Sequence, residues 1–82
     1  MVIHLFGHLQ GDFVLRVVFI DDRQSVEALA NQLQAWGPDL YPHPIPAATI
    51  RNEEGIVLEP AAALTRAGLH AGDIFSVEGM AP

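Results

Sequence analysis

The sequence predicts an α+β domain in which a mixed sheet of four to five strands packs against one helix. Several short runs alternate apolar and polar residues, which is the period of a strand with one buried face. One longer run instead repeats its apolar residues at helical spacing. The chain has 82 residues, of which 50% are hydrophobic and 17% are charged, so it can fill one small core. We therefore expect a single domain over residues 1–82.

The first two predicted strands form a hairpin. Residues 2–9 alternate, and "QGD" at 10–12 is typical of a hairpin turn. Residues 13–20, "FVLRVVFI", are rich in β-branched and aromatic types and predict the second strand. Arg16 indicates which face of that strand is the more exposed. The face predicted to turn inward consists of Phe13, Leu15, Val17 and Phe19, and the outer face of Val14, Arg16, Val18 and Ile20.

A helix is predicted over residues 25–36. Ser25 is a suitable N-cap, and Glu27 places a negative charge in the first turn, where the helix dipole favours it. The Gly-Pro pair that follows ends the helix. Four of the six prolines then fall within residues 37–46, which predicts a loop.

The remaining residues predict shorter elements. Strands are expected at 47–52, 56–59 and 74–78, and a single helical turn at 64–67. One helix can cover only one face of such a sheet, and the first and last strands can lie side by side in its middle. This order of elements is that of the β-grasp, or ubiquitin-like, architecture.

Composition and spacing exclude most kinds of chemistry. The chain has no cysteine, so disulfides, thiolate metal sites and thiol catalysis are ruled out, and its net charge of -6 repels the phosphates of nucleic acid. No apolar run approaches the ~20 residues of a membrane span. His4 and His8 share a strand face but lie ~13 Å apart, which is too far to hold one metal. Paired acids fall in turns, where carboxylates are usually solvated. We expect no catalytic residue, no metal, no cofactor and therefore no enzyme.

The uncovered face of the sheet is the predicted functional feature. A largely apolar patch rimmed by polar groups is rarely left bare by a monomer, which predicts a protein-binding surface. It is centred on Phe6, Arg16 and Val18. Two alternatives remain: the patch reflects strand propensity alone, or another copy of the chain covers it. The residues predicted to form the surface are His4, Phe6, His8, Val14, Arg16 and Val18, with Ile50 beside them.

The chain also resembles a known family. "LTRAGLHAGDIFSV" looks like the end of ubiquitin-like domains, where a helical turn, Gly-Leu and Gly-Asp precede the last strand. "GDFVLRVVFIDD", with Asp12 and Phe13, is similar to the hairpin of the small B (gamma) subunit of bacterial toluene and aromatic monooxygenases. "DRQSVEALANQL" and "VLEPAAALTRAGL" are similar to later parts of that subunit. The resemblance covers about residues 3–78.

The resemblance implies an accessory or assembly subunit of a multicomponent diiron aromatic or hydrocarbon monooxygenase. Members of the family bind the large hydroxylase subunit, and the diiron site and oxygen chemistry lie in that partner. The resemblance thus implies a bacterial protein that acts by protein–protein interaction. The absence of cysteine fits a cytoplasmic location, and the charge and the lack of a long apolar run predict that it binds neither nucleic acid nor membrane.

Two other ubiquitin-like functions remain open. In the first, the chain is a protein modifier joined to targets through Gly79 after removal of "MAP". The absence of lysine fits this hypothesis, because such a modifier could not accept itself. Against it, Gly79 follows the last predicted strand at once, whereas known modifiers present their glycine on an extended tail. In the second, the chain is a ubiquitin-like accessory protein of a secretion system.

Overall fold

The computed structural model describes most of the chain, as residues 1–11, 14–35 and 49–78. The predictions that fall outside these ranges concern Asp12, Phe13, residues 37–46 and Gly79. The described elements are, in chain order, β1 (Val2–Leu9), β2 (Arg16–Asp21), α1 (Val26–Gln34), β3 (Thr49–Asn52) and β4 (Ile74–Glu78).

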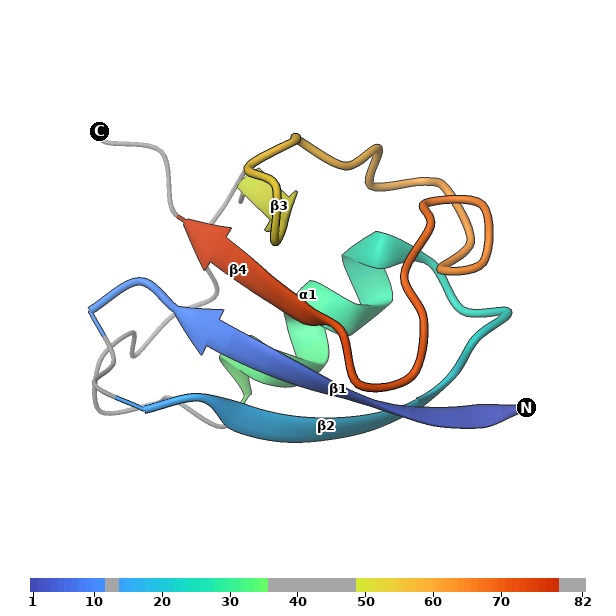
Figure 1. The fold of residues 1–82 in the computed structure, drawn as a ribbon, viewed down its shortest axis with the longest axis horizontal. Helices are drawn as coiled ribbons and strands as arrows, with labels where there is room; N and C mark the ends of the chain where they lie inside the picture. The colour runs from blue at the N-terminus through green and yellow to red at the C-terminus, as the bar shows by residue number, and fades with distance from the viewer. Residues whose placement is uncertain (12–13, 36–48, 79–82) are drawn as a thin grey trace.

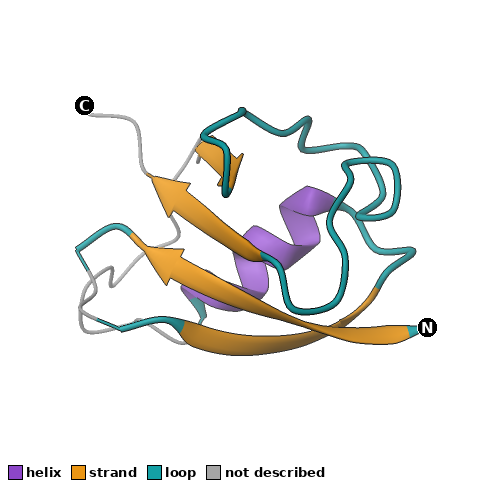
Figure 2. Ribbon diagram, in the orientation of Figure 1, coloured by secondary structure: helices purple, strands orange, loops and turns teal. Residues whose placement is uncertain are grey.

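These strands form one mixed sheet in the order β2-β1-β4-β3, and α1 lies across one of its faces (Figure 1). β1 pairs antiparallel with β2 and parallel with β4, and β4 pairs antiparallel with β3. Figure 2 shows the two layers, with the helix on one side of the strands and a long connection between β3 and β4. The predicted α+β class and the central pairing of the first and last strands are confirmed.

The predicted strand at 56–59 is wrong in part. Its residues contact the edge of β3, where the Leu58 N–H donates to the Ile50 carbonyl over 2.8 Å. Arg51 and Val57 form an isolated bridge there. No continuous strand follows, because "IVLEP" reaches a proline after four residues, and proline lacks the N–H that a ladder needs.

Helix α1 begins as the sequence predicts. The Ser25 side chain accepts a hydrogen bond from the Ala28 N–H over 3.1 Å and so caps the helix. The N–H groups of Val26 and Glu27 donate to the carbonyls of Ala62 and Pro60, over 2.9 and 3.0 Å. First-turn N–H groups have no partner inside a helix. The segment before the predicted helical turn therefore completes the start of α1.

The core lies between α1 and the sheet. Its largest fully buried side chains come from every layer, including the connection between β3 and β4. They are Phe75, Leu5, Leu9, Leu29, Leu33, Leu64, Val18, Val26 and Val77.

Gly7 lies on the core side of β1, directly under two of these side chains. A Cβ atom at Gly7 would come within 2.7 Å of Phe75 Cζ and 2.8 Å of Leu33 Cδ2. Such distances are far below van der Waals contact. The close packing of β4 and α1 over the central strand therefore requires glycine at this position.

We predict that Gly7→Ala lowers the free energy of unfolding by about 1–3 kcal/mol, which is the usual cost of overpacking a core. Removing a glycine from a strand gains about 0.5–1 kcal/mol, which offsets only part of this cost. A urea titration measures the change. The cost of Gly7→Ala should shrink in a Leu33→Ala background, because Leu33 supplies two of the three close atoms. A neutral Gly7→Ala would contradict the close packing.

Candidate protein-binding face

The candidate site is the face of the sheet opposite α1, which we call the outer face. Side chains alternate along each strand, so every second residue points to this face. On β1 and β2 they are Val2, His4, Phe6, His8, Val17, Phe19 and Asp21. On β4 and β3 they are Ile74, Ser76, Glu78, Thr49 and Arg51.

The half of the outer face over β1, β2 and the start of β4 is mostly apolar, with His4, His8 and Asp21 among its apolar side chains. Phe6 pairs with Val17 on one side and with Ile74 on the other, so it lies at the centre. Phe19 is 64% exposed, and it pairs with His4, whose ring meets Phe6 edge to face at 5.8 Å between centroids. We call this group the apolar patch and define it as Val2, Phe6, Val17, Phe19 and Ile74.

The half over β3 and the end of β4 is polar. Arg51 Nε lies 3.7 Å from Glu78 Oε2, and Arg51 Nη1 donates to the Gly55 carbonyl over 2.9 Å. Ser76 pairs with Arg51 beside this ion pair. The outer face is therefore mostly apolar over β2 and β1 and polar over β3, and the change falls along β4.

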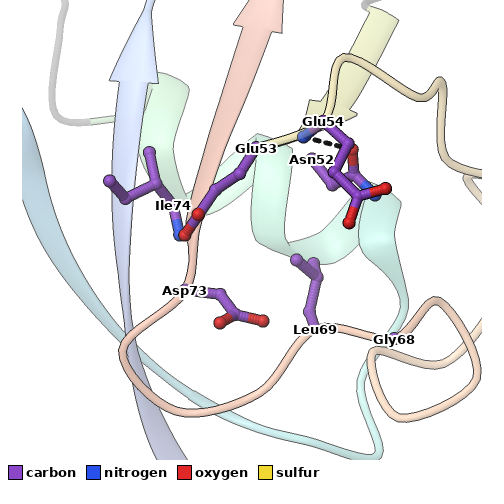
Figure 3. A pocket seen from close by; sticks show the side chains of 7 residues that line it. All are labelled: Asn52, Glu53, Glu54, Gly68, Leu69, Asp73 and Ile74. Atoms are coloured by element: carbon purple, nitrogen blue, oxygen red, sulfur yellow. Dashed lines mark hydrogen bonds between the residues drawn. The ribbon is translucent and has the colours of Figure 1, made fainter.

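A shallow hollow of about 150 Å³ lies beside the apolar patch, next to Ile74 (Figure 3). Two of its three acidic side chains accept hydrogen bonds from the backbone: Glu53 Oε1 accepts from the Ile74 N–H over 2.9 Å, and Asp73 Oδ2 from the His70 N–H over 2.8 Å. Ligand pockets are usually ~300–1,000 Å³ and mostly apolar. Among the described residues, no three histidine or acidic side chains lie together as metal ligands would. The hollow has the character of a stabilised turn.

Comparison with known proteins identifies the fold. The sequence matches no protein-family model and no curated protein, but the structure matches many solved structures. One is a chain of the toluene 4-monooxygenase HD complex with the inhibitor 4-bromobenzoate, with TM-score 0.81 and 14% identity over 94% of this chain and 96% of that one. Another is the ubiquitin of Caldiarchaeum subterraneum, with TM-score 0.76 and 13% identity over 100% and 98%. A ubiquitin-like protein from Trypanosoma brucei has TM-score 0.72 and 14% identity over 98% and 96%.

This chain has the ubiquitin-like β-grasp fold. At these identities the likeness establishes the fold alone, so the ubiquitin-like chain's function has to be argued from its own surface. Within the described ranges, no helix is long and apolar enough to cross a bilayer.

The structure brings three of the predicted binding residues to the outer face of this ubiquitin-like domain. His4 and His8 are exposed there and Phe6 is half-buried between them. Val14 is 54% exposed but precedes β2, and Arg16, at the start of β2, is half-buried opposite Gly7.

The predicted exposure of Val18 and Ile50 is wrong. Val18 is 0% exposed and Ile50 2% exposed, and both belong to the core. In their place the outer face carries Val17 and Phe19, which the sequence analysis assigned to the core. Phe19 is the most exposed aromatic residue of the apolar patch, although its place in "FVLRVVFI" predicted a buried side chain.

The error on β2 has one physical cause, which is the pairing register of that strand. Leu5 pairs with Val18 and Gly7 with Arg16, one residue away from the register that a turn at 10–12 would set. A shift of one residue moves every side chain of a strand to the opposite face. Both faces of "FVLRVVFI" are apolar, so only Arg16 distinguished them. Arginine can lie at the start of a core-facing row because its long stem buries while its charged end reaches water.

The register can be tested with two neighbouring valines. We predict that Val18→Asp costs about 3 kcal/mol or more of unfolding free energy, because it buries an unpaired carboxylate. Val17→Asp, at a position 37% exposed, should cost about 1 kcal/mol or less. Thermal or urea unfolding of the two variants provides the measurement. The reverse order of stabilities would restore the register expected from the sequence.

Proposed function

We propose that this chain is a non-catalytic, ubiquitin-like accessory subunit of a cytoplasmic, multicomponent diiron aromatic or hydrocarbon monooxygenase. In this proposal it binds the large hydroxylase subunit through its outer face. The observation that carries the proposal is the apolar patch, which the described part of the chain leaves exposed. The class of partner comes from the likeness to a chain of the toluene 4-monooxygenase complex, which extends over nearly the whole of both chains.

The apolar patch has the chemistry of a protein interface. Phe6 and Phe19 are large aromatic side chains, and such residues anchor interfaces because they bury much apolar area. They lie diagonally across paired strands, so one partner surface can contact both. Phe19 and Val2 are each 64% exposed, so both side chains contact water unless a partner covers them.

The acidic groups around the patch stabilise local structure and are not arranged for catalysis. Asp21 accepts hydrogen bonds from the Arg23 backbone N–H and from its Nε and Nη2 atoms, over 2.9 to 3.0 Å. These bonds hold the pKa of the Asp21 carboxyl well below its usual range. Glu53 and Asp73 hold turns, as described above. In the proposal, the iron and oxygen chemistry belongs to the partner.

Two substitutions in the apolar patch test the proposal. Phe6→Ala combined with Phe19→Asp should abolish co-purification with the diiron hydroxylase encoded by the same organism, because the anchors are lost and a charge enters the interface. Circular dichroism should stay native, since both positions face away from the core. The matched control is Ile56→Asp, at a position 54% exposed in the turn after β3, which should leave binding intact. Retained binding by the double variant would refute docking through the patch.

The last four residues, 79–82, provide a test that distinguishes this proposal from the protein-modifier hypothesis. We predict that deleting residues 79–82, which follow the last residue of β4, changes the hydroxylase affinity by no more than about 1 kcal/mol, or fivefold. A modifier instead needs a terminal glycine carboxylate at Gly79. Intact-mass measurement of the native protein should show Met80, Ala81 and Pro82 still present. A mass ending at Gly79, or adducts joined through it, would favour the modifier. A complex with secretion components in place of a hydroxylase would favour the secretion hypothesis.

A further inference from the structure

We infer that the partner surface seated on the apolar patch is itself apolar and rimmed by arginine or lysine, and that it is not a second copy of this chain. The inference rests on the proposed function for the identity of the partner. The charges around the patch carry the argument.

Acidic groups border the apolar patch on two opposite sides. Asp21 ends β2 and pairs with Val2 at one end of the patch. On the β4 side, Asp73 directly precedes Ile74, and the Glu53 carboxylate accepts the Ile74 N–H over 2.9 Å. A partner that covers the patch must therefore approach these three carboxylates.

The nearby cations pair with Asp21 and Glu78 rather than with Glu53. Arg23 Nη2 lies 3.0 Å from Asp21 Oδ2, and Arg51 Nε lies 3.7 Å from Glu78 Oε2. Asp21 is thus already compensated by Arg23 and by the N-terminal ammonium, which lies 3.6 Å from its Oδ1. The negative part of the rim is therefore the β4 side, at Glu53 and Asp73. The chain as a whole has a net charge of -6, which has the same sign as Glu53 and Asp73 beside Ile74.

A second copy of the chain fits this surface poorly. Two outer faces placed together would present the same acidic rim to each other, on chains that each carry a net charge of -6. Like charges brought together at an interface suppress association. A basic rim on the partner instead complements Glu53 and Asp73 and accelerates encounter.

The test measures binding kinetics between the hydroxylase and the full chain. The Debye length falls from ~10 Å to ~3 Å between 0.1 M and 1 M salt. The association rate constant should therefore fall by about tenfold or more, with the dissociation rate constant nearly unchanged. Purely apolar docking would show no such loss.

A charge-matched pair of variants places the effect at the rim. Glu53→Gln with Asp73→Asn keeps oxygen acceptors for the Ile74 and His70 N–H groups but removes two charges. At 0.1 M salt it should lower the association rate constant about threefold or more. The control, Glu27→Gln with Glu59→Gln, removes two charges at the start of α1 and in the segment that contacts it, and should change the association rate constant much less. Each variant is checked for native circular dichroism.

Sedimentation of the isolated chain completes the experiment. A monomer at about 100 μM in low and high salt supports the inference, and a dimer that Phe19→Asp dissociates overturns it. Hydroxylase binding that ignores salt, or responds equally to both double variants, overturns the inference alone. No hydroxylase binding at any salt overturns the proposed function together with it.

Discussion

The packing of this domain depends on the absence of a side chain at Gly7. Phe75 of β4 and Leu33 of α1 occupy the space that a Cβ atom would need. The central strand can therefore contact the helix layer and the last strand at one point. Because Gly7 points inward, its neighbours Phe6 and His8 point outward. One buried contact thus fixes which face of β1 is available to a partner.

The register between β1 and β2 extends this constraint to the edge of the sheet. Leu5 is fully buried and pairs with Val18, so Val18 enters the core, and Val17 and Phe19 must then lie outside. The apolar patch is the consequence of completing the core with alternate residues of a strand that is apolar throughout. The parallel pairing of Phe6 with Ile74 then places side chains of the first and last strands next to each other on that face.

Local signals in the sequence predicted most of the fold and only part of the site. Ser25 and the helical spacing placed α1, and alternation together with the order of the elements placed the first and last strands in the middle of the sheet. Alternation also placed His4, Phe6 and His8 on the outer face. It could not assign the face of β2, because "FVLRVVFI" has no polar period, and Arg16 lies at the strand start where its stem can bury. Ile50 was likewise assigned to the wrong face, because β3 has only four residues in which to show a period.

The missing period in β2 is itself informative about function. β2 is an edge strand, and edge strands usually carry charges that prevent unwanted association. Here Val17 and Phe19 are apolar and exposed, while the Phe19 carbonyl accepts a hydrogen bond from Gln32 Nε2 over 3.0 Å. Helix α1 thus partly protects the hydrogen-bonding edge of β2, but it does not cover the side chains that β2 presents on the outer face. Strands buried on both faces are near-continuous apolar runs. The continuous apolar run of β2, which prevented its register from being predicted, is therefore the pattern expected of a strand whose second face is covered in a complex. The proposed docking requires such a covered face.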